Sequence, residues 1–182
     1  MSTHTKTIRT LTDDITDITM ENPDLCYQCG KCSAGCPIRN YMDEAPNLII
    51  RYVQLGLYNN AFESRTPWLC AGCQTCSTRC PKNFDLAKFM DALRELALKM
   101  GYKVKEKNQL KFHNAFLKQI RNHGRSYELG LVRDYKLSSG DLLSDVDSAP
   151  GMFLKGKIGV FPNNIKDKES VKRIFEKTKD KK

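Results

Sequence analysis

Eight cysteines, arranged in two runs of identical spacing, carry the clearest chemistry in this 182-residue chain. Each run has the pattern C-x2-C-x2-C-x3-C-P, and together the two runs use every cysteine. The runs are Cys26, Cys29, Cys32, Cys36, Pro37 and Cys70, Cys73, Cys76, Cys80, Pro81. This spacing is typical of bacterial proteins that hold 4Fe–4S clusters on four thiolates. The sequence therefore predicts two 4Fe–4S clusters as the cofactors.

The fourth cysteine of each run is expected to serve the opposite cluster. Three cysteines spaced by two residues wrap one cluster, and the fourth, separated from the third by three residues, is carried past it. The prediction for cluster 1 is the set Cys26, Cys29, Cys32 and Cys80. The prediction for cluster 2 is the set Cys70, Cys73, Cys76 and Cys36. These eight residues are the predicted metal ligands, and no catalytic residue is predicted.

Zinc and disulfides are the alternatives for so many cysteines. Zinc sites use C-x2-C pairs separated by a longer loop, and they do not need the third and fourth cysteines seen in each run here. Disulfides require an oxidising compartment, and the polar start of the chain is unlike a secretory signal. The clusters are favoured over zinc, and zinc over disulfides, and we expect a cytoplasmic protein without a membrane span.

Basic charge is concentrated in the second half of the chain. The whole chain has a formal net charge of +9, but residues 1–98 are near neutral. Residues 99–125 carry +7 and residues 150–182 carry +6. Such a surface fits acidic protein partners, nucleic acid or plain solvation. We favour protein partners over nucleic acid, and a zinc-binding, nucleic-acid-associated protein is the competing hypothesis from another class.

The elements around the cysteines are expected to be helices. Apolar spacing predicts helices from Pro46 to Gly56, over 57–63, and from an N-cap at Asp85 to Gly101. Further helices are expected at 108–123, which is basic, and at 167–178, with an irregular stretch at 124–156 and a short strand at 157–161. The expected fold is mainly α, a helical ferredoxin with a helical and irregular C-terminal extension.

Three regions are predicted: an N-terminal arm (1–23), a ferredoxin domain with both clusters (24–102), and a basic extension for partner docking (103–182). The arm packs weakly or adds a short strand. The single tryptophan, Trp68, either shields a cluster or fills the core, and both His113 and His123 are expected at the surface. No nucleotide-binding, protease or hydrolase motif is present in the sequence, so the chemistry on offer is one-electron transfer.

Several stretches resemble the C subunit of heterodisulfide reductase over residues 24–125. They are Cys26-Tyr-Gln-Cys29-Gly-Lys-Cys32-Ser-Ala-Gly-Cys36-Pro37, Arg51-Tyr-Val-Gln-Leu-Gly56, Ser64-Arg-Thr-Pro-Trp-Leu-Cys70, Arg79-Cys80-Pro81, Met90-Asp-Ala-Leu-Arg-Glu-Leu-Ala97 and the helix at 112–125. The cysteine runs alone would also fit other helical ferredoxins, including the iron–sulfur subunit of succinate dehydrogenase. Residues 126–182 match in general character only.

The resemblance implies an electron-transfer subunit of a soluble oxidoreductase complex. In methanogens, the C subunit carries electrons from the flavin-containing A subunit to the B subunit, which reduces the coenzyme M–coenzyme B heterodisulfide. Partners would be the A and B subunits, together with a hydrogenase or formate dehydrogenase that acts through the A subunit. The chain alone would be a carrier without a substrate site. The alternative is a C-subunit-like ferredoxin of another dehydrogenase, sulfur-metabolism or quinone-linked complex.

Overall fold

The computed structural model describes residues 11–141, 159 and 161–179, and its described elements are all helical. The mainly α fold predicted from the sequence is confirmed. The chain divides into two compact units, Met1–Glu106 and Lys107–Lys182. The sequence placed the start of the basic extension at residue 103. No described helix is long and apolar enough to cross a bilayer.

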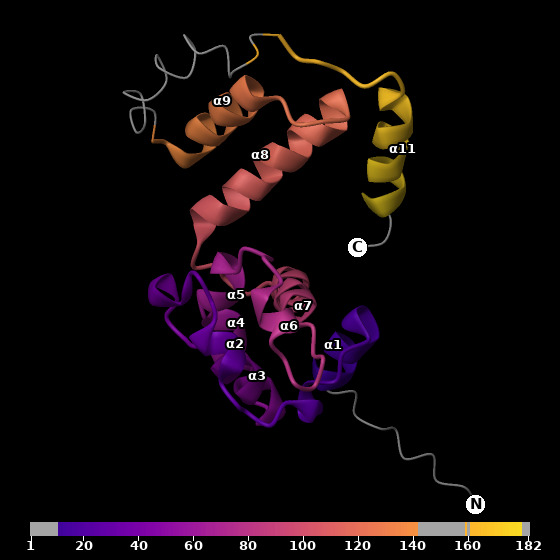
Figure 1. Cartoon of the computed structure of the whole chain (residues 1–182). Coiled ribbons are helices and arrows are strands. Elements are labelled where there is room, and N and C mark those ends of the chain that lie inside the picture. The colour runs from indigo at the N-terminus through magenta and orange to yellow at the C-terminus, as the bar shows by residue number, and fades with distance from the viewer. Residues whose placement is uncertain (1–10, 142–158, 160, 180–182) are drawn as a thin grey trace, which may run out of the picture. The chain divides into compact units, whose positions relative to one another are not determined.

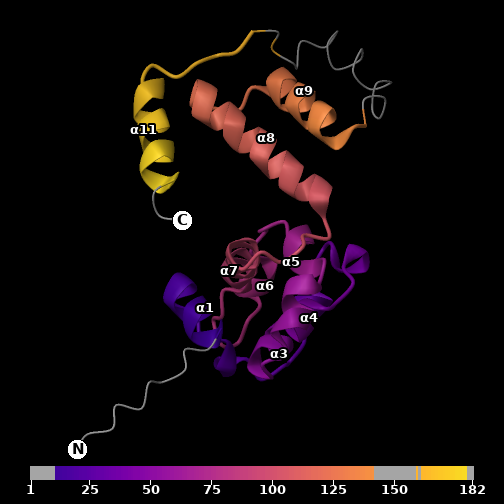
Figure 2. The ribbon, with the colours of Figure 1, turned by 180° about the vertical axis from the view of Figure 1, so that it is seen from behind.

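The described residues of the first unit, 11–106, form nine helices and include both cysteine runs. The helices are α1 (Leu11–Thr19), η1 (Pro23–Leu25), α2 (Lys31–Ala34), η2 (Arg39–Tyr41), α3 (Pro46–Gln54), α4 (Tyr58–Glu63), α5 (Thr66–Leu69), α6 (Thr75–Thr78) and α7 (Leu86–Lys99). Figures 1 and 2 show α1 to α7 of this unit from opposite sides. The cysteine loops lead into α2 and α6, and these two helices pack against each other.

Helix α7 is the main packing element of this unit. It starts where the Asp85 carboxylate accepts hydrogen bonds from the backbone N–H groups of Ala87 and Lys88, as an N-cap does. Its apolar residues recur at helical spacing, and Phe89, Met90 and Leu93 are almost fully buried. Helix α7 packs against α1, α4, α5 and α6. It therefore ties the N-terminal segment to both sides of the second cysteine loop.

Helix α3 supports the first cysteine loop. Pro46 occupies its first turn, where the missing N–H leaves no hydrogen bond unmade, and Gly56 follows its end with a left-handed φ of 69°. Ile49, Ile50 and Val53 are buried. Helix α3 contacts α1, α2, α4 and η1. The sequence located this helix correctly because its end signals and its apolar period agree.

The N-terminal segment differs from the prediction. The sequence suggested a weakly packed arm or a short strand, but residues 11–19 form helix α1. Ile15 is completely buried, and α1 packs against α3 and α7. The Thr19 hydroxyl donates to the Ile15 carbonyl at 2.7 Å, which satisfies a buried polar group. Threonine and aspartate obscured the helix because they favour caps and turns, and packing on α7 overrides that preference.

The second unit is built around the long helix α8 (Lys107–His123). It packs against α9 (Glu128–Ser139) and α11 (Lys168–Lys179), which Figure 1 shows beside it. The expected helices at 108–123 and 167–178 are confirmed. The prediction of an irregular stretch at 124–156 is wrong over α9, where the chain is helical. The strand expected at 157–161 falls largely outside the described residues, since only 159 and 161 of that span are described.

Glycine explains why α9 was missed. Gly130 reads as a helix breaker in the sequence, yet a Cβ there would lie 2.5 Å from both the Gln119 Oε1 of α8 and the Tyr127 ring. The missing side chain lets α9 approach α8 closely. The buried Gln119 amide then donates to Asp134 of α9 at 2.9 Å, and the Lys118 ammonium pairs with the same carboxylate at 2.8 Å. These contacts exist only once the two helices meet.

Candidate iron–sulfur centres

The eight cysteines surround two hollows in the first unit. We call them the Cys26 hollow, with about 350 Å³ of empty space, and the Cys70 hollow, with about 410 Å³, and both volumes include space open to solvent. The cysteines lining the Cys26 hollow are Cys26, Cys29, Cys32, Cys76 and Cys80. Those lining the Cys70 hollow are Cys32, Cys36, Cys70, Cys73 and Cys76. Each hollow thus has the fourth cysteine of the opposite run in its wall.

The two hollows share a wall. Cys32, Cys76 and Leu86 line both of them. Apolar side chains complete each lining, with Ile50 and Phe84 in the Cys26 hollow and several others in the Cys70 hollow. Because three residues are common to both linings, any two groups held in these hollows would be close neighbours.

The second cysteine of each run faces outward. Cys29 and Cys73 are exposed, whereas the other six are half-buried. Each exposed cysteine lies between two residues with left-handed backbone, namely Gln28 and Gly30 in the first loop and Gly72 and Gln74 in the second. The chain therefore turns sharply around the outermost cysteine in both loops. Each hollow has one inner side toward the other hollow and one sulfur edge toward solvent.

Burial raises the pKa of four thiols, and these are the first and third cysteines of each run. They are Cys26, Cys32, Cys70 and Cys76. The negative charges of neighbouring cysteines raise the pKa further, including Cys80 acting on Cys26 and Cys36 acting on Cys70. In both of these pairs, the fourth cysteine of one run lies near the first cysteine of the other run. Thiolates held in such sites need a compensating positive charge, which iron supplies.

Arg94 of α7 is a half-buried cation near the Cys70 hollow. Its side chain is 17% exposed, and its guanidinium donates to the Cys70 carbonyl at 3.4 Å. Burial lowers the pKa of Arg94, and the charge of the Cys70 thiolate acts in the opposite direction. A second contact, to the exposed Asp91 carboxylate, completes its surroundings. The guanidinium therefore favours the thiolate form of Cys70.

A serine follows the third cysteine in each run, and each is held by the helix behind its loop. The Ser33 hydroxyl donates to the Asn47 side-chain oxygen at 2.5 Å, and the Asn47 backbone N–H donates back to Ser33 at 3.1 Å. The Ser77 hydroxyl donates to the Asp85 carboxylate at 3.0 Å. The first turns of α3 and α7 thus hold equivalent points of the two loops.

Gln54 anchors the entry to the first loop. Its side-chain amide donates to the carbonyls of Pro23 at 2.8 Å and of Cys26 at 2.9 Å. Both contacts cross from α3 to the segment that leads into the cysteines. Because the carbonyl of Cys26 belongs to the first cysteine of the run, Gln54 fixes where the loop begins.

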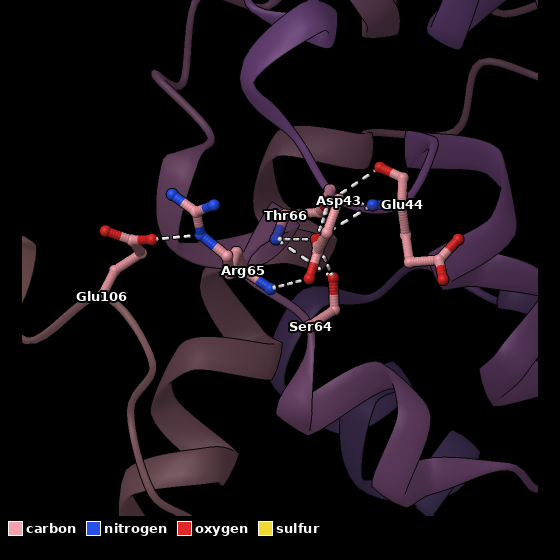
Figure 3. Close-up of polar contacts among 6 residues, drawn as sticks. All are labelled: Asp43, Glu44, Ser64, Arg65, Thr66 and Glu106. Carbon is pink, nitrogen blue, oxygen red and sulfur yellow. Dashed lines mark hydrogen bonds and ion pairs between the residues drawn. The ribbon is translucent and has the colours of Figure 1, made fainter.

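Asp43 anchors the entry to the second loop (Figure 3). Its carboxylate accepts hydrogen bonds from the Ser64 hydroxyl at 2.7 Å, the Arg65 N–H at 2.8 Å, and both the N–H and the hydroxyl of Thr66 at 3.1 and 2.9 Å. The Glu44 N–H adds another at 2.9 Å. Burial raises the pKa of Asp43, but these hydrogen bonds outweigh it and hold the pKa at about 2.

Sequence reasoning did not identify Asp43, Gln54 or Arg94. Gln54 and Arg94 occur in the sequence only as members of stretches that resemble the C subunit, and Asp43 belongs to no motif. No periodic or motif signal marks these residues, because their partners come from other segments.

Trp68 is 2% exposed but lines neither hollow, which supports its role in the core. His113 and His123 lie on α8, in the other unit.

Comparison with known proteins identifies the cysteine region. Residues 23–84 match the 4Fe–4S dicluster domain. Among curated relatives, the iron–sulfur C subunit of the CoB–CoM heterodisulfide reductase of Methanopyrus kandleri is 40% identical over 80 residues. That match covers 44% of this chain and 42% of the relative. This chain is similar to the C subunit of heterodisulfide reductase.

Two further relatives agree over a comparable span. The C subunit of the ferredoxin:CoB-CoM heterodisulfide reductase of Methanosarcina acetivorans is 35% identical, covering 46% of this chain and 33% of the relative. The C subunit of the H(2):CoB-CoM heterodisulfide,ferredoxin reductase of Methanothermobacter marburgensis is 30% identical, covering 43% of each. This chain spans less than half the length of the curated relatives it matches.

The dicluster match confirms the prediction of two 4Fe–4S clusters. The shape of the hollows agrees with it, because their donors are thiolates and their linings are otherwise apolar. Within residues 11–141, 159 and 161–179, no three His, Cys, Asp or Glu side chains converge on a point that would hold one metal ion. The cysteines instead surround spaces, which fits clusters better than single zinc ions.

Replacing Asp43 with alanine should destabilise the second loop. Hydrogen bonds to a charged group contribute about 1.5–3 kcal/mol, and several donors would lose their acceptor, so we expect Asp43→Ala to lower the stability of the first unit by about 2–3 kcal/mol. Since the folded pKa of about 2 lies below 3.8, the contribution is present above about pH 4 and is lost as the pH falls toward 2. The measurement is anaerobic urea unfolding at pH 7, followed by helix signal and cluster colour.

Glu95→Ala is the matched control. Glu95 pairs with Lys99 on the exposed side of α7, and an exposed pair contributes about 1 kcal/mol or less. A urea midpoint for Asp43→Ala no lower than that of Glu95→Ala would contradict the role assigned to Asp43.

Proposed function

We propose that this protein is an electron-transfer subunit of a heterodisulfide reductase complex. It relays electrons from a flavin-containing A subunit to a catalytic B subunit that reduces the coenzyme M–coenzyme B heterodisulfide. The observation that carries this proposal is the arrangement of the two hollows, which share a wall and have one exposed cysteine each. The curated relatives, named as C subunits of heterodisulfide reductases, suggest the identity of the complex.

The residues of the chain suit a relay. A bound 4Fe–4S cluster supplies a site that takes up and gives back one electron. Cys32, Cys76 and Leu86 keep the two sites adjacent, and apolar side chains limit the access of water to the inner sulfurs. Exposed Cys29 offers one edge to a donor or acceptor, and exposed Cys73 offers the other. Electrons thus have a short path through the first unit.

The ligand sets form part of this proposal. Cys26, Cys29, Cys32 and Cys80 would hold one cluster, and Cys70, Cys73, Cys76 and Cys36 would hold the other. Two observations support the crossed arrangement: Cys80 lines the Cys26 hollow, and Cys36 lines the Cys70 hollow. Cys32 and Cys76 line both hollows, and the run to which each belongs assigns it to one cluster.

The partners and location follow from the same reasoning. The A and B subunits would be the direct partners. A hydrogenase or formate dehydrogenase would act through the A subunit, and the complex would work in the cytoplasm.

The basic second unit would dock acidic protein surfaces. Lys168 and Lys177 on α11 are exposed, and the apolar Ile174 on the same helix is 60% exposed. Charge together with an apolar anchor suits a protein interface.

A second candidate has one observation in its favour. A relative from Archaeoglobus profundus, named only as similar to the C subunit of heterodisulfide reductase, is 35% identical over 72 residues, covering 39% of this chain and 38% of the relative. A C-like ferredoxin serving another dehydrogenase, sulfur-metabolism or quinone-linked complex would use the same two cluster sites. Anaerobic purification with identification of the bound proteins separates the two proposals, since only the first expects the A and B subunits.

Cysteine substitutions test the crossed ligand sets. In Cys80→Ala, the cluster of Cys26, Cys29 and Cys32 should be damaged first, because it would lose its fourth thiolate. Iron analysis should fall from about eight atoms per chain toward about four, and one of two electron paramagnetic resonance signals should disappear. Cys36→Ala is the matched change in the other run and should remove the other signal. Loss of the same signal in both variants would contradict the assignment.

Reconstitution tests the relay itself. The chain alone should not reduce heterodisulfide, because its cysteines are all committed to the clusters. Added to the A and B subunits with an electron donor, it should restore turnover measured as thiol release. Cys80→Ala should bind the partners but restore little turnover. Heterodisulfide reduction by the chain alone would overturn the proposal.

Charge reversal tests docking by the second unit. Lys168→Glu combined with Lys177→Glu should slow association with the partner by about tenfold at low salt, and the difference should shrink at high salt because charges are screened. Lys82→Glu with Lys88→Glu makes the same net change at exposed positions of the cluster unit and serves as the control. Equal slowing by both pairs, measured by biolayer interferometry, would argue against a dedicated docking surface.

A further inference from the structure

We propose that Gln28 is a positioning residue that raises the reduction potential of the cluster in the Cys26 hollow. Its side-chain amide donates a hydrogen bond to the Cys26 sulfur, with Nε2 and Sγ 3.5 Å apart. This inference rests on the proposed ligand set, in which Cys26 binds the cluster. The Cys26 sulfur in the structure stands for the thiolate that would be bound to iron.

A chain of hydrogen bonds is consistent with the Gln28 amide turning its nitrogen toward the sulfur. The Asn47 backbone N–H donates to the Ser33 hydroxyl, and that hydroxyl donates to the Asn47 side-chain oxygen. The Asn47 side-chain nitrogen is then the group turned to Gln28, and it donates to the Gln28 Oε1 at 3.0 Å. With its oxygen used in this way, Gln28 presents its N–H groups to Cys26.

The backbone of Gln28 adopts an unusual conformation. Its φ is 62°, in the left-handed region that side chains other than glycine rarely adopt. The second loop has Gly72 at the same register, also with a φ of 62°. Glycine thus suits this position, yet the first loop has a glutamine there. The left-handed backbone does not by itself require a side chain here, so the case for Gln28 rests on its contact with the Cys26 sulfur.

Gln74 provides an internal comparison. It lies one residue after the exposed cysteine of the second loop, where the first loop has Gly30. Its φ is also 62°, but its side chain is exposed, whereas that of Gln28 is half-buried. In the described part of the chain, no hydrogen bond joins the Gln74 side chain to a sulfur. The two loops therefore differ in whether their glutamine reaches a cysteine.

The electrostatic consequence has a definite sign. A cluster and its thiolates gain negative charge on reduction, and an N–H dipole aimed at a ligand sulfur stabilises that extra charge. The Gln28 amide should therefore favour the reduced cluster. Removing it should lower the potential of that cluster while leaving its neighbour unchanged, so the potential difference across the shared wall would change.

Redox titration of the full, cluster-loaded chain, followed by electron paramagnetic resonance, tests this inference. The variants are Gln28→Gly, which introduces the residue found at this register in the second loop, and Gln28→Met, which keeps the length but has no N–H. In both, one of the two reduction steps should shift down so that the reduced-to-oxidised ratio at a fixed potential falls about tenfold, or about 59 mV for one electron. The other step should not move.

Gln74→Gly and Gln74→Met are the matched controls and should leave both steps in place. Unchanged midpoints in both Gln28 variants, or equal shifts in the Gln74 variants, would overturn the role of Gln28. The iron content of the unsubstituted chain distinguishes this outcome from failure of the proposed function. About eight irons per chain and two electron paramagnetic resonance signals would support the two clusters, whereas fewer irons or signals would overturn both proposals.

Discussion

The thiols of two separate cysteine runs must come together around two hollows, and the rest of the first unit depends on this requirement. Neither run can complete a hollow alone, because Cys36 and Cys80 each line the hollow of the other run. Burial raises the pKa of the inner thiols, so a bound metal centre would favour their charged forms by supplying positive charge.

The longer helices of the first unit hold the two short cysteine loops in position. Helices α2 and α6, which follow the loops, have only four residues each and cannot be stable by themselves. Longer helices hold them through polar side chains: Asn47 at the start of α3 binds Ser33, and Asp85 at the start of α7 binds Ser77. Asp85 also caps α7, so one carboxylate links the packing core to a cysteine loop.

The repeat is symmetric in its spacing but not in its chemistry. One loop is entered from a segment held by Gln54, the other from a segment held by Asp43. A half-buried guanidinium, Arg94, lies near one hollow, and a side-chain amide, Gln28, reaches a sulfur of the other. Charges and dipoles around a cluster set its potential, so such differences give two similar sites different affinities for an electron.

The sequence by itself determined the cofactor and most helices, because cysteine spacing, N-caps, terminal glycines and apolar period are local signals. Cys26 to Cys36 and Cys70 to Cys80 show their chemistry without any tertiary information, as Asp85 and Gly101 show the ends of α7. Tertiary structure decided what depends on contacts between distant segments. Helix α1 forms because Ile15 finds a buried place, and α9 forms because Gly130 admits Gln119. Asp43 gains its donors only when folding brings residues 64–66 beside it. Gln28 and Cys26 are neighbours in the sequence, but Asn47, which binds the Gln28 amide oxygen, is brought to them by the fold.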